Sequence, residues 1–338
     1  MELPAIHALR ASNPDAHITA AGAFPALQIL DADPALDELF SLQDWGLHHW
    51  GDYGAPGIHP RIQEWLQQQS FDLILDASHT VIALKDAAND SGIPQLNVDP
   101  DEQDSLLREG FNGLSAIREG VRRNWGIEVP ESLLPRLYLR EEDYRFAREF
   151  LQGQNGGNNP LIGISPVASS HLKRWPVERL AAVADWLVEA RDAHLLLFHG
   201  PQREAAEQTV SAMQHRNSVT MAGELHLRKV AALLSRCRLL ICNDTGLMHM
   251  AAAVGIPAFA VFGPTAPNIY LPQQNNSRAA GWNVQCPFRN TQKFGPSFCL
   301  IENHCEAGQY CMNQISTEEV LIELNSFVED LKQEEIYH

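Results

Sequence analysis

The sequence predicts an α/β protein of two doubly wound, Rossmann-like domains, and three observations lead to this fold class. The chain has 338 residues, 45% of them hydrophobic, which is too many for one ordinary core and suits two domains. From residue 161 onward, short apolar runs alternate with segments of helical period. The first half repeats this alternation less regularly. Such an order indicates parallel sheets covered by helices on both faces.

The second half of the chain gives the clearest series of elements. Its expected strands are 161–165, 194–198, 218–222, 238–242 and 257–262. Its expected helices are 177–190, 203–213, 227–237 and 247–254. The first of these helices has apolar residues at i, i+3 and i+4, which is the pattern of a helix with one buried face. Ligands of such sheets bind at the carboxyl ends of the strands, so we expect the site in the loops that follow them.

The first half of the chain predicts a smaller set of elements, followed by a linker. The expected helices are 4–12, 61–69 and 81–90, and the expected strands are 17–22, 71–77 and 94–98. Gly and Asn residues at 152–160 bury little and cost much to order, so this segment is expected to join two domains, 1–151 and 161–338. Two Rossmann-like domains facing a cleft make a GT-B-like architecture, a pattern that several α/β enzymes share.

The charge of the chain excludes some functions. With 42 acidic and 25 basic side chains, the net charge of −17 repels polyanions and disfavours nucleic acid as a partner. Apolar runs such as 251–263 are interrupted by Gly and Pro and are too short to span a membrane. Residues 1–4 have neither the basic start nor the apolar stretch of a secretory signal. We expect a cytoplasmic protein with at most peripheral membrane contact.

Two loops of the second half carry the candidate anion site. Residues 243–249, NDTGLMH, lie between a buried strand and an Ala-rich helix. Free backbone N–H groups at that helix start, together with Gly246, make a seat for a diphosphate; alternatively, Asp244 and Thr245 only cap the helix. In residues 169–176, Lys173 and Arg174 are a local pair of cations in an acidic chain; alternatively, they are solvated beside a core residue, Trp175.

Residues 243–267, NDTGLMHMAAAVGIPAFAVFGPTAP, closely resemble the signature of glycosyltransferase family 9, the ADP-heptose:lipopolysaccharide heptosyltransferases. Residues 169–176 are similar to the phosphate-binding loop of that family. Four segments resemble its first helix and the rest of its N-terminal domain: 3–10, 13–16, 33–37 and 71–76. The resemblance covers most of the chain and is densest at 161–267.

The resemblance implies an inverting transfer of a sugar, heptose from ADP-heptose, to a hydroxyl of a lipopolysaccharide-core or related glycan or glycolipid, which enters from the N-terminal domain. The residues implied to hold the donor diphosphate are Ser169, Ser170, Lys173, Asp244, Thr245, Gly246, Leu247 and His249. No cofactor is required, because an ammonium with hydroxyl and backbone donors stabilises the departing diphosphate. Glu204 lies near the family's ribose site; alternatively, it only suits the first turn of a helix.

The general base is not found where the family has it. There, a Gly-Asp pair directly upstream of the Leu-Pro-Ala segment deprotonates the acceptor, whereas here Leu3 is the third residue, so the pair and the first strand are missing. Either the true start lies upstream, or the base is lost or relocated, with Asp52, Asp76 and His79 as candidates. A non-catalytic nucleotide-sugar-binding or assembly protein is therefore an alternative function. A third is another GT-B enzyme, such as a nucleotide-sugar epimerase.

A group of arginines forms the only notably basic region: Arg118, Arg122, Arg123, Arg136, Arg140, Arg145 and Arg148. These side chains are expected either to meet phosphates of the acceptor or to lie on a solvated helix face, paired with neighbouring Glu.

Four of the six cysteines crowd into a stretch without helical or strand period: Cys286, Cys299, Cys305 and Cys311. In a reducing compartment such a cluster suggests metal more than disulfides, and the four thiols are candidate ligands of a structural zinc or iron, with His304 as a substitute ligand. No pair has the tight C-x2-C spacing, so free thiols packed under the loop are the alternative. A metal here would hold the loop, and an oligomer contact if there is one, rather than take part in catalysis.

Overall fold

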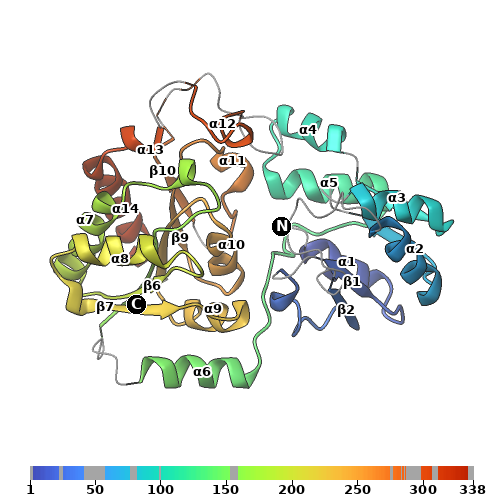
Figure 1. Cartoon of the computed structure of the whole chain (residues 1–338), viewed down its shortest axis with the longest axis horizontal. Helices are drawn as coiled ribbons and strands as arrows, with labels where there is room; N and C mark the ends of the chain where they lie inside the picture. Colours follow the sequence, from blue (N-terminus) through green and yellow to red (C-terminus); the bar gives the residue numbers. More distant parts are fainter. Residues whose placement is uncertain are drawn as a thin grey trace. The chain divides into compact units, whose positions relative to one another are not determined.

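The computed structural model describes residues 3–22, 26–41, 58–76, 82–98, 100–152, 159–274, 277–282, 284, 286, 298–306 and 311–333. The chain divides into two compact units, Met1–Tyr138 and Leu139–His338 (Figure 1). This division differs from the boundary predicted at 152–160, because helix α6 (Glu141–Leu151) belongs to the second unit. Residues 153–158 of the predicted linker lie outside the described residues.

Polar contacts, which no hydrophobic pattern reveals, join α6 to α9 (Leu227–Leu234) of the second unit. The Arg228 guanidinium of α9 lies 3.0 Å from the carboxylate of Asp143 and 2.8 Å from that of Glu142. Asp143 is buried and also accepts a 2.9 Å hydrogen bond from the backbone N–H of Arg140 at the helix start. Helix α6 is therefore held to the second unit by buried charge.

A six-stranded, wholly parallel sheet forms the centre of the second unit. Its strands are β5 (Leu161–Ser165), β6 (His194–Phe198), β7 (Val219–Gly223), β8 (Leu239–Asn243), β9 (Ala258–Val261) and β10 (Arg278–Ala280). They are ordered β10-β9-β8-β5-β6-β7, so the chain moves outward from β5 to β7 and then returns to place β8 on the other side of β5. This reversal is the topological switch point of a doubly wound sheet, and the five predicted strands are confirmed.

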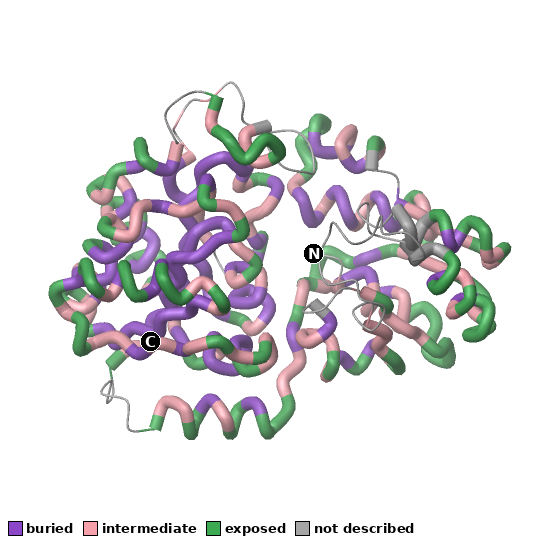
Figure 2. Tube along the Cα trace, viewed as in Figure 1, coloured by how far each residue is buried: buried purple, intermediate pink, exposed green. Residues whose placement is uncertain are grey.

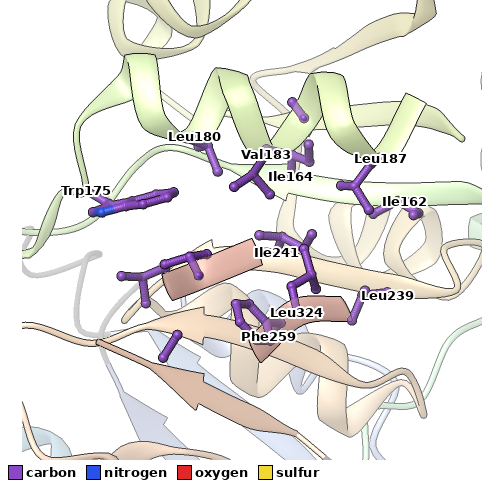
Figure 3. Close-up of a cluster of buried hydrophobic side chains, with 14 of the residues drawn as sticks. Ile162, Ile164, Trp175, Leu180, Val183, Leu187, Leu239, Ile241, Phe259 and Leu324 are labelled. Carbon is purple, nitrogen blue, oxygen red and sulfur yellow. The ribbon is translucent and has the colours of Figure 1, made fainter. Parts of the chain in front are cut away.

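Helices pack on this sheet through apolar side chains. The longer helices are α7 (Val177–Arg191), α8 (Arg203–Ala212), α9, α10 (Gly246–Ala253) and α14 (Thr317–Gln333). In Figure 3, side chains of α7 point toward side chains of the strands: Leu180, Val183 and Leu187 on the helix, Ile162, Ile164 and Ile241 on β5 and β8. Figure 2 shows the central strands as buried along their length. Trp175 is 1% exposed, which confirms its expected place in the core.

The segment that follows β9 is less regular than the rest of the unit. It contains only short elements among the described residues: α11 (Pro267–Tyr270), β10, α12 (Phe298–Ile301) and α13 (Cys311–Gln314). The stretch around the four clustered cysteines, which shows no helical or strand period in the sequence, therefore does contain regular elements, because short turns of helix and one short strand fall below the length at which a period is visible.

The first unit has smaller parallel pairs, β1 (Thr19–Gly22) with β2 (Glu38–Ser41) and β3 (Ile74–Asp76) with β4 (Gln95–Asn97). Its helices are α1 (Leu3–Ser12), α2 (Ile58–Gln69), α3 (Ile82–Ser91), α4 (Pro100–Arg108) and α5 (Gly113–Trp125). The predicted helices and strands of this half are confirmed, while β2, α4 and α5 were not predicted. No helix in the described part of the chain is long and apolar enough to cross a membrane.

Candidate functional site

The loops that follow β5, β8 and β9 meet at the carboxyl edge of the sheet, beside the switch point. Lys173 ends a short 3-10 turn (His171–Lys173) after β5, and Asp244 directly follows β8. Lys173 Nζ lies 2.6 Å from Asp244 Oδ2, although the two residues are 71 positions apart. The two loops singled out in the sequence, 169–173 and 244–249, therefore converge.

Asn243 fixes the geometry of the first loop. This residue is 2% exposed, and its side-chain amide donates to the backbone oxygen of Pro166 at 2.9 Å. Its Oδ1 accepts a 3.0 Å hydrogen bond from the backbone N–H of Trp175. Within the loop, Ser170 Oγ accepts from the backbone N–H of Leu172 at 3.2 Å. One buried side chain at the end of β8 thus holds both stems of the loop that carries Lys173.

A third side chain, Thr265, completes the contact. Thr265 lies beyond the end of β9, and its Oγ1 donates to Asp244 Oδ2 at 2.7 Å. The side chains of Lys173 and Asp244 are 17% and 8% exposed, and Thr265 is 4% exposed. Thr265 is a residue of this site that was not predicted from the sequence. Its position after the strand next to β8 was the signal that could have found it.

The start of α10 is open. Thr245 is the N-cap residue in extended backbone, but its side chain makes no capping hydrogen bond, and the Asp244 carboxylate is bound to Lys173 and Thr265. Thr245 thus takes the N-cap position, as the capping interpretation expects, but its side chain does not supply the capping hydrogen bond. Gly246 is exposed, has no atom within 4 Å of where a Cβ would lie, and is not in the left-handed region. Neither packing nor backbone conformation requires glycine here, which suits close approach by a ligand.

His249 and Arg174 flank the ion pair. The pKa of His249 is lowered to about 4, mainly by burial and also by the ammonium of Lys173, while the carboxylate of Asp244 opposes the change. The imidazole is therefore neutral near pH 7 and offers hydrogen bonds rather than charge. The Arg174 guanidinium approaches the backbone oxygen of Ala168 at 3.4 Å, and its Nε is buried without a partner among the described residues. Of the two predicted cations, Lys173 is the one paired with Asp244.

Glu204 lies apart from the ion pair on the first turn of α8, exposed, where its carboxylate accepts from Gln208 at 3.1 Å. The preceding loop does touch the site, because Gln202 Nε2 donates to the backbone oxygen of Ala168 at 3.2 Å. Ser169, in the same loop as Ala168, is exposed.

The arginine-rich region is largely paired with acidic neighbours. Arg122 and Arg123 both lie 2.6 Å from Glu119, and these hydrogen bonds lower the pKa of Glu119 to about 2. Arg148 lies 2.7 Å from Glu141, and Arg118 donates to backbone oxygens of residues 131 and 133. The interpretation of this region as a solvated helix face with Glu partners is confirmed for Arg122, Arg123 and Arg148.

The candidates for a relocated base are not tested by the structure. Asp52 and His79 lie outside the described residues, and Asp76 ends β3 with its side chain outside them as well.

The four clustered cysteines are free thiols, each partly buried. Burial is the main cause that raises the pKa of Cys299, and the charges of Cys311, Cys286 and Cys305 add to it. Within the described ranges, no group of three or more His, Cys, Asp or Glu side chains is arranged to hold a metal ion. The zinc or iron site therefore has no support among these residues and stays a prediction.

The topology and the buried ion pair define a doubly wound α/β protein with a cationic loop at its switch point. A family model described as glycosyltransferase family 9 (heptosyltransferase) matches residues 115–295, more than half of the chain. The chain belongs to this family, and the resemblance seen in the sequence is confirmed.

Known proteins similar to this chain include lipopolysaccharide heptosyltransferase 2 of Escherichia coli strain K12, which is 29% identical over 178 residues, 51% of this chain and 50% of the relative. The chain spans about half the length of this relative and of its Salmonella typhimurium counterpart.

Two solved structures share the fold. The glycosyl transferase family 9 protein from Veillonella parvula DSM 2008 has a TM-score of 0.73 at 22% identity, covering 96% of this chain and 92% of that chain. The E. coli ADP-heptose lps heptosyltransferase II has a TM-score of 0.69 at 20% identity, covering 99% and 95%. These similarities confirm the predicted GT-B-like fold class.

Proposed function

We propose that this protein is an inverting glycosyltransferase that moves heptose from ADP-heptose to a hydroxyl of a lipopolysaccharide-core or related glycan. The observation that carries the proposal is the Lys173–Asp244 ion pair, which brings a cation of a strongly acidic chain to the carboxyl ends of the central strands. Family membership and the heptosyltransferase names of the relatives support the class of reaction.

The donor diphosphate lies, in this proposal, between loops 169–173 and 244–249. Its partners are the ammonium of Lys173, the hydroxyls of Ser169, Ser170 and Thr245, the backbone at Gly246 and Leu247, and the neutral imidazole of His249, with Asp244 beside them. An ammonium that is largely shielded from water acts more strongly on a phosphate than an exposed one. Negative charge gathers on the departing ADP in the transition state, and these donors stabilise it there.

The residues that hold the diphosphate do not account for deprotonation of the acceptor or for binding of the donor ribose. The acceptor hydroxyl must lose a proton to a carboxylate or imidazole, and that base is unassigned. The ribose of the donor is assigned to Glu204, whose exposed carboxylate is free to accept from hydroxyls on the side that Gln208 does not occupy.

Isothermal titration calorimetry with ADP, GDP and UDP tests the donor site. We expect the wild type to bind ADP and Lys173→Met to lose at least about tenfold in affinity, because a charge-assisted contact to phosphate is removed. Lys332→Met is the matched control, since Lys332 is also ion-paired, 3.2 Å from Glu329, on α14 away from the site. Failure of the wild type to bind any of these nucleotides, or equal affinity in both lysine variants, contradicts the proposal.

A transfer assay separates the enzyme from its alternatives. The protein is incubated with ADP-heptose and a heptose-deficient lipopolysaccharide core, and we expect release of ADP and addition of one heptosyl group, with the opposite anomeric configuration by NMR. Binding without turnover would support the non-catalytic nucleotide-sugar-binding protein. An isomerised donor sugar formed without acceptor would support the epimerase.

A further inference from the structure

Asp244 is an unexpected residue to find at a diphosphate site, because a carboxylate repels phosphate. Its Oδ2 accepts from two donors at once, Lys173 Nζ at 2.6 Å and Thr265 Oγ1 at 2.7 Å. These three side chains come from the loops after β5, β8 and β9, and none is more than 17% exposed. Thr265 therefore contacts Asp244, and Asp244 in turn contacts the ammonium of Lys173.

We infer that Thr265 and Asp244 are positioning residues: the hydroxyl fixes the carboxylate, and the carboxylate holds the Lys173 ammonium in place for the donor diphosphate. The inference rests on the proposed function and extends it to a residue that does not touch the ligand. Thr265 acts only through Asp244 and Lys173.

The chemistry of lysine explains why such support is useful. Its ammonium sits on a flexible four-carbon stem, and ordering that stem on ligand binding costs conformational entropy. A stem that is already ordered does not pay this cost again when the ligand arrives. The ammonium has three N–H donors, and the one given to Asp244 leaves two for phosphate oxygens. Asp244 also keeps the empty site close to neutral, so the buried cation is not left unpaired.

A second buried threonine shows what a purely structural role looks like. Thr209 in α8 is 1% exposed, and its hydroxyl donates to the backbone oxygen of Ala205 one turn earlier at 2.8 Å. Thr265 instead donates to an ionised side chain of another loop. The pair Thr265 and Thr209 therefore offers a matched comparison of the same residue type, buried and hydrogen-bonded in the same unit.

The experiment compares Thr265→Val and Thr209→Val in the full chain by calorimetric titration with ADP. We expect Thr265→Val to weaken ADP binding about tenfold, the effect of losing one hydrogen bond to a charged group. We expect Thr209→Val to bind ADP like the wild type. Thr265→Ser keeps the hydroxyl and is expected to restore wild-type affinity, which guards against a folding defect in the valine variant. Loss of affinity in the serine variant as well overturns the inference.

A double-mutant cycle decides whether Thr265 acts through Lys173. We expect Thr265→Val to cause no further loss of ADP affinity in a Lys173→Met background, because its effect passes through the ammonium. If the two substitutions reduce ADP affinity independently, so that their factors multiply, the inference is overturned and the proposed function stands. The same holds if Thr265→Val binds ADP like the wild type while Lys173→Met binds it weakly. A wild type that binds no nucleoside diphosphate overturns both.

Discussion

Replacing Asn243 tests whether one buried amide holds the loop of the candidate donor site. Asn243→Leu keeps the approximate volume of the side chain but removes its hydrogen bonds to the backbone oxygen of Pro166 and the backbone N–H of Trp175. Because Asn243 is only 2% exposed, water does not reach these two backbone groups to replace the lost hydrogen-bond partner.

The size of the effect follows from the two groups left unpaired. Each buried, unsatisfied backbone group costs about 1–3 kcal/mol, so the free energy of unfolding is expected to fall by about 2–6 kcal/mol. For a folding unit of this size, each kcal/mol lowers Tm by about 2–4 °C. Because Trp175 begins the segment that leads into the core helix α7, the loss is expected to extend to the position of Lys173 and to weaken ADP binding.

Urea unfolding followed by tryptophan fluorescence measures the stability, and calorimetry measures ADP affinity. Asn325→Leu is the control, because Asn325 lies on α14, where its side chain accepts from Arg191 at 2.6 Å at an exposed position. We expect the control to change stability by less than about 0.5 kcal/mol. If Asn243→Leu is as stable as the control, the conclusion that Asn243 holds both stems of this loop is refuted.

Three further predictions follow from the site and its surroundings. Gly246→Ala is expected to change the free energy of unfolding by less than about 1 kcal/mol, since no atom lies near its Cβ position, yet to weaken ADP binding because the added methyl group occupies space that the ligand would approach. Gly281→Ala, whose Cβ would lie 2.4 Å from Ile315, should destabilise the fold. Calorimetric Tm and ADP titration of both variants check this. The lowered pKa of His249 means that the unfolded chain binds a proton that the folded chain refuses, so its contribution to stability is complete above about pH 6.5 and is lost as the pH falls toward about 4. His249→Gln should therefore reduce the slope of unfolding free energy against pH in that window, as measured by urea unfolding at a series of pH values; an unchanged slope would contradict this prediction. Finally, a thiol reagent should label Cys286, Cys299, Cys305 and Cys311 in the folded protein and reach Cys237 and Cys242 only after unfolding, because the first four are partly exposed and the last two are buried. Protection of the first four, with zinc or iron released on denaturation, would contradict this labelling pattern and support the metal site.

The strands of the second unit's sheet could be predicted from the sequence because each of the central strands is a continuous apolar run. The alternation of strands and helices predicted a parallel sheet with its ligand loops at the carboxyl ends of the strands, whereas the strand order, which makes β5 and β8 neighbours, was not predicted. Strand β10 has three residues and gave no pattern. Helix α6 was not predicted, and its residues fell within the predicted first domain, because its attachment to the second unit depends on Arg228 and Asp143, which are charged side chains 85 positions apart.

The position of the site at the carboxyl edge of the sheet could be predicted from the sequence, but the contacts between its side chains could not. A polar residue after a strand is compatible with capping, with ligand binding and with an ion pair, and only the direction of the side chain separates these roles. For Asp244 that direction is set by Lys173 and Thr265, neither of which is near it in sequence. Thr265 could be placed at the correct edge of the sheet, but the hydrogen bond that it donates could not be foreseen.

The reversal of strand order also has a consequence during synthesis. Lys173 belongs to the half of the sheet made by β5, β6 and β7, whereas Asp244 and Thr265 belong to the half made by β8, β9 and β10. A nascent chain that has emerged only as far as β7 carries the lysine without its counter-charge. In the proposed donor site, the residues that hold the diphosphate come together only when the later half docks along β5, so we expect a chain that ends before β8 not to retain ADP.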